Sequence, residues 1–337
     1  MELMMLAKDI MQRKQNPITY PCYILNTRVD TEEELNSELS KIFLFTYRSG
    51  FDPLPKSSCR TDKGWGCLAR SCQMMIGRML AMHFRTDLRF AYFRDVDEPD
   101  APFSIHNLVR GMLNQSLTFQ PNFWSPTQGC EAIRYAVAAA VNRKLVKTPV
   151  SVLVAEGGTV SHRDVEFRLN EMGSVMLLIP VRVGIKRHIN QQTFMALEHM
   201  MQTRLSLGVI GGVPRRSYYL VGTCGQRLLY LDPHSVKPAM IRAEDVSCDV
   251  EIAKTLPAVS WDRIDTSLLF GFFLKSHDDW IEFSAHVKKN TELCGIERLF
   301  YLDVGDGRRP DASDLLNNGQ RAEDAIMTWS SSEEDDR

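Results

Sequence analysis

Gly64-Trp65-Gly66-Cys67 marks the start of a predicted helix that runs from Cys67 to about Phe84. Apolar side chains recur around most of the circumference of this helix, so we expect it to be buried on most sides. The predicted strands come mainly after this segment, and this order of elements decides the fold class. The cysteine at the helix start is the residue on which a functional interpretation depends.

The position of Cys67 suits a nucleophile. The first turn of a helix has free N–H groups and a partial positive charge, and both favour a thiolate over a thiol. Gly64 and Gly66 allow a tight turn and let a substrate carbonyl come close to the sulfur. The motif alone leaves two interpretations open, a nucleophile and a packing cysteine that begins a core helix.

Composition excludes several classes of protein. Of the 337 residues, 44% are hydrophobic and 24% charged, which is typical of a soluble globular protein. The net charge of −2 gives no electrostatic reason to expect nucleic-acid binding. No apolar run is long enough to span a bilayer, and Met1 to Arg13 lacks the apolar core of a signal peptide. These features predict a cytoplasmic protein.

The cysteine pattern predicts neither disulfides nor a metal site. Cysteines occur at positions 22, 59, 67, 72, 130, 224, 248 and 294, and in a cytoplasmic protein they are expected to be thiols. Cys67 and Cys72 are the one close pair, and no histidine or cysteine follows at zinc-site spacing. We expect no metal and no cofactor.

Helical patterns dominate the first half of the chain. Thr31 to Glu34 forms a capping-box pattern, and apolar residues up to Phe43 follow at helical spacing, so this helix is expected to run into residues 45–48. Further helices are predicted at Ile105–Leu113 and Gly129–Val141, within a less regular stretch from about 93 to 170.

Strand patterns follow in the second half. The segment from Ser174 to Val181 has no polar alternation, so it is expected to be buried on both faces. Other strands are predicted at 205–210, 218–221, 228–231 and 267–274, with a helix at 278–287. Helices first and a sheet afterwards predict an α+β fold. Beyond Gly305 the chain is polar and ends in an acidic run, so we expect a domain over 1–304 and a disordered acidic tail over 305–337.

His234 is the strongest candidate for a base. It lies in Asp232-Pro233-His234 at the end of a predicted strand, and Pro233 pushes Asp232 towards an extended conformation. Positions i and i+2 of an extended chain face the same side, so the carboxylate could hold the imidazole in one tautomer. A simple strand-ending turn with a surface histidine is the alternative. Spacing does not show whether Cys67 and His234 meet.

The reaction also needs donors for the developing oxyanion. The backbone N–H of Cys67 is one candidate because it lies at a helix start. Periodicity does not identify the second donor.

Six ordered blocks together resemble the autophagins, the cysteine peptidases that process the ubiquitin-like modifier of autophagy. The first two are Phe45-Thr46-Tyr47-Arg48 and Thr61-Asp62-x-Gly64-Trp65-Gly66-Cys67-x-x-Arg70. The others are Leu177-Leu178-Ile179-Pro180, Leu207-Gly208-Val209-Ile210-Gly211-Gly212, Tyr230-Leu231-Asp232-Pro233-His234 and Gly271-Phe272-Phe273-x-Lys275.

This resemblance implies a papain-like fold with a small inserted subdomain at about 91–170. It also implies that Cys67 is the nucleophile, His234 the base and Asp232 its orienter. Tyr47 matches the tyrosine of the family's oxyanion site, and Trp124 matches the tryptophan that lies over the catalytic cysteine.

The resemblance further implies two reactions. The enzyme would cut the modifier precursor after its C-terminal glycine, and it would hydrolyse the amide between that glycine and phosphatidylethanolamine. The modifier would provide most of the binding surface, and the membrane surface would be met transiently through the substrate.

Some positions depart from the family pattern. The regulatory loop is expected just before Leu207, where Arg204-Leu205-Ser206 replaces the usual proline, so Arg204 is a candidate cleft residue. Ser71 stands where some members have a second cysteine, and the modifier-binding motif expected near Trp329 is incomplete.

Two alternatives remain. Proteases of the ubiquitin-fold modifier UFM-one share Gly-Trp-Gly-Cys and Asp-Pro-His, although the blocks at Tyr47, Leu207 and Phe272 favour an autophagin. The other alternative is a non-catalytic modifier-binding protein that has kept the fold.

Overall fold

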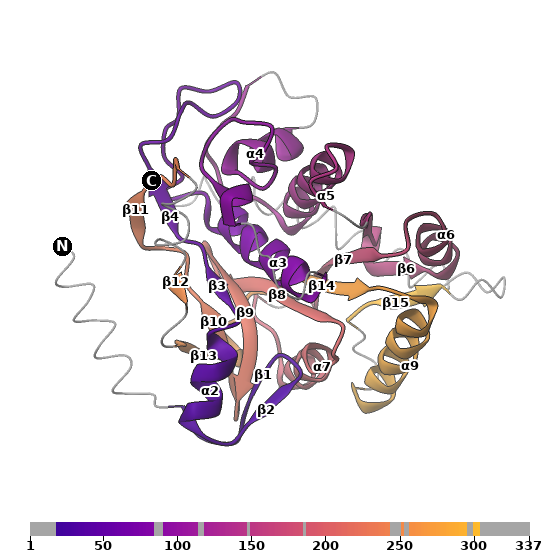
Figure 1. Cartoon of the computed structure of the whole chain (residues 1–337). Helices are drawn as coiled ribbons and strands as arrows, with labels where there is room; N and C mark the ends of the chain where they lie inside the picture. Colours follow the sequence, from indigo (N-terminus) through magenta and orange to yellow (C-terminus); the bar gives the residue numbers. More distant parts are fainter. Residues whose placement is uncertain are drawn as a thin grey trace.

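A computed structural model describes residues 18–83, 90–113, 118–146, 149–184, 187–242, 251–252, 256–294 and 299–303 (Figure 1). The expected acidic tail and the N-terminal segment lie outside these residues. None of the described helices has both the length and the apolar character needed to cross a membrane.

The central element is a nine-stranded sheet in which seven strands follow the order β13-β10-β9-β8-β14-β7-β5 and a β1–β2 hairpin joins β9. All its pairs are antiparallel except β5–β7. The strands are β1 (Cys22–Ile24), β2 (Thr27–Val29), β5 (Ser151–Val154), β7 (Val175–Arg182), β8 (Ser206–Val213), β9 (Arg216–Cys224), β10 (Arg227–Leu231), β13 (Ala258–Ser260) and β14 (Ser267–Leu274).

Three short strand pairs lie outside this sheet. They are β11 (Val236–Pro238) with β4 (Tyr47–Ser49), β12 (Glu251–Ile252) with β3 (Phe43–Leu44), and β15 (Tyr301–Asp303) with β6 (Thr159–Ser161). The pair β4–β11 is parallel and sets Tyr47 opposite Val236.

Helices cover both faces of the sheet (Figure 1). One face packs against α3 (Cys67–His83), α4 (Ile105–Leu113) and α5 (Pro126–Asn142), and the other against α6 (His162–Met172), α7 (Gln191–Met201) and α9 (His277–Cys294). Along β7, Met176 and Leu178 face the first core, whereas Val175, Leu177 and Ile179 face the second. This alternation explains why β7 shows no polar period, because both of its faces are buried.

The predicted helix at Cys67 is confirmed. α3 begins at Cys67 and ends at His83, and residues Cys67 to Gly77 are all buried. It packs on β8 and β9 beside α5, which packs on β5, β7 and β14, and it also contacts α4. The helices at 105–113 and 278–287 and the strands at 174–181 and 267–274 also form close to where the sequence predicts them.

The helix predicted after Thr31 is shorter than expected. α2 (Glu32–Leu39) is capped by the Thr31 hydroxyl, which accepts the Glu34 N–H. It ends at Ser40, whose hydroxyl donates to the carbonyl of Ser37, a side-chain bond that competes with helix continuation. The apolar residues that follow belong to β3 instead, and Tyr47 lies in β4 rather than at a helix end.

The segment 91–170 holds α4 and α5, but it also contributes β5 and α6. β5 is hydrogen-bonded to β7 within the main sheet, in a register that places Ser151 opposite Val175. A small inserted subdomain therefore stays a proposal, and we restrict it to the part before β5.

Candidate active site

A tight turn places Cys67 at the start of α3. The carbonyl of Asp62 accepts the N–H groups of both Trp65 and Gly66, and Gly64 has a φ of +88°. A Cβ atom on Gly66 would lie 2.6 Å from the Cβ of Asp62, so a side chain there does not fit. The turn delivers Cys67 as the first helical residue, with its side chain 2% exposed.

Asp232 and His234 come together at the end of β10. One carboxylate oxygen of Asp232 lies 2.5 Å from Nδ1 of His234 and accepts the backbone N–H of His234 at 3.0 Å. The intervening Pro233 carbonyl accepts the N–H of Tyr47 at 2.9 Å. The extended Asp-Pro-His segment thus has the side-by-side geometry that its sequence predicts.

Nε2, the ring nitrogen of His234 that does not bond to Asp232, is the one that faces Cys67. Nε2 is buried and, among the described residues, makes no hydrogen bond of good geometry. The imidazole nevertheless interacts with the Cys67 sulfur closely enough to change the acidity of both groups. Hydrogen bonds between catalytic groups commonly tighten when a substrate binds.

The electrostatics favour a thiolate–imidazolium pair. Burial raises the pKa of Cys67, but the His234 imidazole, the Ser217 backbone N–H and the Tyr47 hydroxyl together bring it below its usual value. Burial lowers the pKa of His234, but Asp232 and Cys67 outweigh this and raise it to about 9. Burial also raises the pKa of Asp232, and the interaction with His234 lowers it overall.

Tyr47 reaches the same sulfur from β4. Its ring is 3% exposed and lies edge-on to the His234 ring, with 5.3 Å between the ring centroids. Burial, followed by the Cys67 charge, raises the pKa of Tyr47 far above its usual range, so the hydroxyl keeps its proton and can donate a hydrogen bond.

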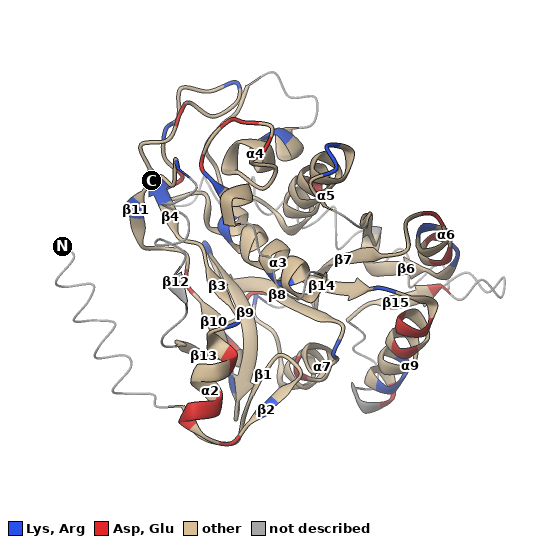
Figure 2. Cartoon of the chain, in the orientation of Figure 1, with Lys and Arg blue, Asp and Glu red and all other residues tan. Residues whose placement is uncertain are grey.

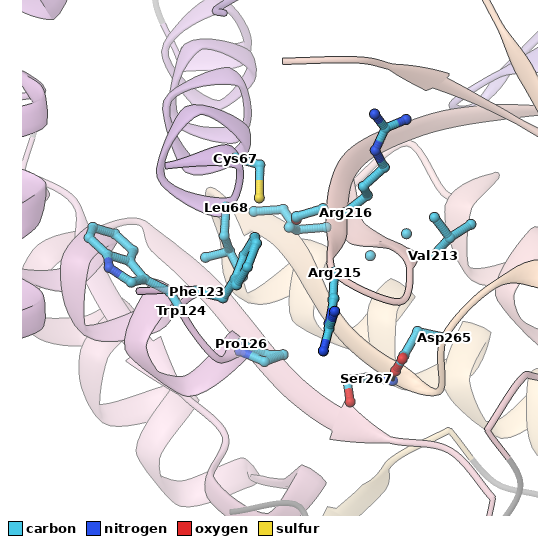
Figure 3. A pocket seen from close by; sticks show the side chains of 14 residues that line it. Cys67, Leu68, Phe123, Trp124, Pro126, Val213, Arg215, Arg216, Asp265 and Ser267 are labelled. Atoms are coloured by element: carbon cyan, nitrogen blue, oxygen red, sulfur yellow. Dashed lines mark hydrogen bonds between the residues drawn. The ribbon is translucent and has the colours of Figure 1, made fainter. Parts of the chain in front are cut away.

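A cleft opens beside Cys67 (Figure 3). In this view the sulfur points towards a space with Phe123 and Trp124 on one side and Arg215 on the other. Trp124 is 2% exposed, and its ring centroid lies 6.0 Å from that of Trp65. The lining residues are Cys67, Leu68, Phe123, Trp124, Pro126, Ile210, Gly211, Gly212, Val213, Arg215, Arg216, Ser217, Asp265 and Ser267.

The turn between β8 and β9 supplies the charged wall of this cleft. Arg215 has a φ of +66°, a left-handed conformation that non-glycine residues rarely adopt and that is found at functional turns. Its exposed guanidinium makes no ion pair with any other residue in the described part of the chain. The sequence analysis missed Arg215, Arg216 and Ser217; their place in a short connection between two predicted strands was the available signal.

Arg204, the expected cleft residue, is not among the residues that line this cleft. Arg204 lies in the turn before β8, whereas the cleft is lined by the far end of this strand, at Ile210 to Val213. Its guanidinium pairs with Asp279 at 2.6 Å and Glu282 at 2.5 Å, on the acidic first turns of α9 (Figure 2). The family resemblance places the loop at the start of β8, whereas the cleft residues of this strand lie at its other end.

No group of three or more His, Cys, Asp or Glu residues that could hold a metal ion occurs within the described ranges. The other described histidines have structural surroundings: His162, for example, accepts from the Trp280 indole, and His199 stacks on His286.

Comparison with known proteins identifies the family. The model of the peptidase C54 catalytic domain matches residues 32–286. "Probable cysteine protease atg4" of Schizosaccharomyces pombe is 31% identical over 258 residues, which cover 76% of this chain and 77% of that protein. "Cysteine protease ATG4B" of Gallus gallus is 28% identical over 355 aligned positions, covering 90% and 89% of the two chains. A rice protein, "Cysteine protease ATG4B" of Oryza sativa, is 29% identical over 304 positions, covering 77% and 62%.

These matches confirm the predicted autophagin resemblance and, with the mixed sheet flanked by helices, the papain-like α+β fold. The chain belongs to the peptidase C54 family and is an autophagy-related cysteine peptidase.

Proposed function

We propose that this peptidase cleaves the ubiquitin-like modifier of autophagy after its C-terminal glycine, both in the precursor and in the conjugate with phosphatidylethanolamine. The observation that carries the proposal is the shared location of Cys67, His234 and Asp232 beside a cleft that Trp124 lines.

In the proposed mechanism, Cys67 is the nucleophile. Its sulfur attacks the glycine carbonyl carbon, and the carbon–nitrogen bond breaks as Nε2 of His234 gives its proton to the leaving amine. The resulting thioester reacts with water, and His234 takes the water proton as a base. Asp232 fixes Nδ1 of His234 as the protonated nitrogen, so Nε2 always faces the sulfur.

The developing oxyanion would be stabilised by two donors. The backbone N–H of Cys67 is one of the groups at the start of α3 that have no partner within the helix, and the Tyr47 hydroxyl lies against the sulfur. The raised pKa of Tyr47 keeps it a donor throughout the reaction.

The residues that line the cleft support the proposal that the substrate ends in glycine. Trp124 and Phe123 oppose the β8–β9 turn, and Gly211 and Gly212 form part of the wall next to Cys67. A chain that ends in glycine presents its backbone without a side chain, which suits a narrow passage between an indole and a backbone wall. We propose that the modifier makes most of the contacts and that the lipid is met transiently at a membrane surface.

A reporter fused after the modifier's terminal glycine tests the proposal. Release by wild type and none by Cys67→Ser is expected. If both proteins leave the fusion intact, catalysis on this substrate is excluded and a modifier-binding role becomes the better explanation. A matching fusion of the UFM-one modifier is the second arm. Cleavage of that fusion alone would replace the proposal with the UFM-one protease alternative.

A further inference from the structure

The Asp62 carboxylate lies between the two segments that carry the proposed nucleophile and the proposed oxyanion donor. We propose that Asp62 is a positioning residue, which holds Tyr47 and Cys67 at the distance that the reaction requires. This inference rests on the roles proposed above for those two residues, but its test does not need the modifier.

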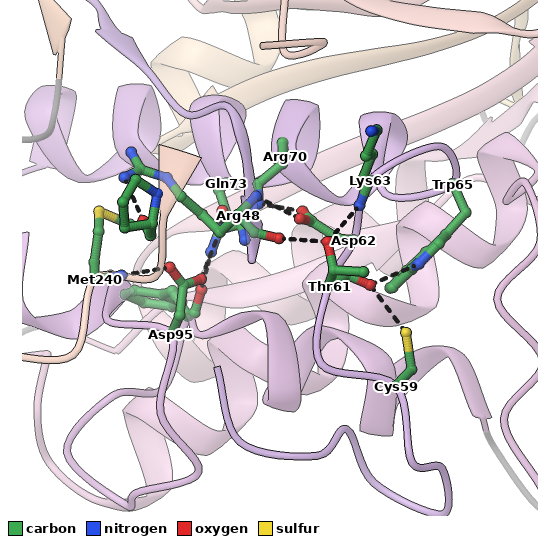
Figure 4. Close-up of polar contacts among 12 residues, drawn as sticks. Arg48, Cys59, Thr61, Asp62, Lys63, Trp65, Arg70, Gln73, Asp95 and Met240 are labelled. Carbon is green, nitrogen blue, oxygen red and sulfur yellow. Dashed lines mark hydrogen bonds and ion pairs between the residues drawn. The ribbon is translucent and has the colours of Figure 1, made fainter. Parts of the chain in front are cut away.

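One carboxylate makes both contacts. Oδ1 of Asp62 accepts the backbone N–H of Arg48 at 2.5 Å, and Arg48 directly follows Tyr47. Oδ2 accepts from Nε of Arg70 at 2.6 Å, one turn into the helix that Cys67 begins (Figure 4). The carboxylate therefore joins β4 to the first turn of α3.

The backbone of Asp62 adds to the same connection. Its N–H donates to the Arg48 carbonyl, and its own carbonyl accepts the N–H of Gly66, the residue before Cys67. Asp62 thus contacts the neighbours of both Tyr47 and Cys67 in the chain, through its side chain and its main chain.

Arg70 also makes hydrogen bonds to residues other than Asp62. Its Nη1 atom donates to Asp95 at 2.8 Å and to the side chain of Gln73 at 2.9 Å. The other oxygen of Asp95 accepts the Met240 N–H at 3.0 Å. Asp62, Arg70 and Asp95 are all 0% exposed, so water cannot replace any of these bonds.

Only a carboxylate can make both side-chain bonds. The N–H of Arg48 and Nε–H of Arg70 are both donors, so the residue between them needs two acceptor atoms. Asparagine has nearly the same shape but offers a single acceptor oxygen, and its NH₂ group must then face one of the two donors. Asp62→Asn therefore breaks one half of the link while changing little volume.

Loss of the Asp62 charge and displacement of Cys67 would change the pKa of the Cys67 thiol in opposite directions. Removing a nearby negative charge would, by Coulomb's law alone, make Cys67 easier to ionise. Misplacing Cys67 relative to His234, Ser217 and Tyr47 would weaken the hydrogen bonds that favour the thiolate, and ionisation would become harder. The direction of the change therefore separates a positioning role from a purely electrostatic one.

The experiment measures the pH dependence of Cys67 alkylation by iodoacetamide, with mass spectrometry of the full chain. The midpoint is the pH at which Cys67 is alkylated at half of its maximal rate. For Asp62→Asn we expect this midpoint to lie at higher pH than in wild type. With a cleavable substrate we expect kcat to fall roughly 10- to 100-fold with little change in KM, because small misplacements mainly affect the transition state.

Asp95→Asn is the matched control, because it removes an equally buried carboxylate from the same arginine, whereas no hydrogen bond joins Asp95 to β4 or to the turn before Cys67 in the described part of the chain. It should keep the wild-type midpoint. If both variants shift the midpoint equally, or if Asp62→Asn leaves it unchanged or lowers it, the proposal is overturned.

Arg70→Lys covers the case in which Asp62→Asn does not fold. Lysine keeps the positive charge, but it has one nitrogen atom and cannot donate to Asp62 and Asp95 from two separate nitrogens, as Arg70 does. A folded Arg70→Lys protein with a wild-type midpoint would also overturn the proposal. A wild-type protein that alkylates normally but cleaves no modifier would instead refute the proposed substrate and leave this inference intact.

Discussion

A single oxygen of Asp232 accepts both Nδ1 of His234, at 2.5 Å, and the backbone N–H of the same residue, at 3.0 Å. Two bonds to one residue fix the imidazole by its ring and by its main chain. The ring can then present only Nε2 to the cysteine.

Asp232→Ala should therefore retain only a trace of activity. Without the carboxylate the imidazole can adopt the wrong tautomer, and loss of an orienting acid in a comparable triad costs about 10⁴-fold in kcat. Reporter release under saturating substrate measures the effect. Circular dichroism serves as the folding control, and a folded variant with kcat within tenfold of wild type would contradict the proposed role.

Activity should follow a bell-shaped pH profile. The thiolate is lost as pH falls through the lowered pKa of Cys67, and the imidazolium is lost as pH rises through about 9, the raised pKa of His234. Because the folded pKa of His234 lies above its unfolded value of 6.5, its contribution to stability is complete below pH 6.5 and is lost as the pH rises from there through about 9. The apparent values belong to the pair rather than to either group.

In His234→Ala, the pH dependence of alkylation reports the pKa of Cys67 without the imidazole. The imidazole is the strongest of the interactions that lower the pKa of Cys67, so the midpoint of its alkylation should move to higher pH. An unchanged midpoint would show that His234 does not act on the sulfur.

Tyr47→Phe should lower kcat without raising KM. The change removes one hydroxyl that lies against Cys67, and loss of one oxyanion donor typically costs about 10²–10³-fold. Steady-state kinetics on the reporter separate the two constants. Tyr135→Phe, on the exposed side of α5, is the control and should behave as wild type.

Two glycine-to-alanine changes should have opposite effects. At Gly66 a Cβ would lie 2.6 Å from Asp62, so the turn before Cys67 must shift and both activity and stability should fall. At Gly77, inside α3, the closest contact is an ordinary 3.8 Å, and alanine should stabilise the helix by about 0.5–1 kcal/mol. Thermal unfolding and reporter cleavage check both; equal behaviour of the two variants would refute this account of the turn.

Arg204→Ala should leave kcat and KM unchanged. Arg204 forms a half-exposed ion-pair cluster with α9, and such pairs contribute about 0–1 kcal/mol to stability. Arg215→Ala, in the wall of the cleft, should raise KM instead. If the two variants exchange these results, the assignment of the cleft wall is wrong.

Local patterns predicted much of the fold. α3 and β14 were recognised because their apolar residues follow clear helical or buried-strand patterns. α7 was not predicted, although Asn190 caps it and its buried residues Phe194, Leu197 and Met201 recur at helical spacing. The parallel pairing of β5 with β7 depends on contacts between distant segments, which no local pattern contains.

The same limit applies to the site. The neighbours Asp232 and His234 could be placed together from an extended tripeptide, since only two residues separate them in the chain. The approach of Tyr47 to Cys67 depends on how β4 packs, and the bonding of Ser217 to the sulfur depends on how β9 crosses α3. Residue spacing alone determines neither arrangement.

The pairing of β4 with β11 has a consequence for protein synthesis. Tyr47 emerges from the ribosome early, yet its strand partner begins at Val236, just after the histidine. A nascent chain that already contains Cys67 therefore lacks both the proposed base and the strand that pairs with the proposed oxyanion tyrosine. On the proposed mechanism, the site is therefore complete only once the chain has been translated past Val236.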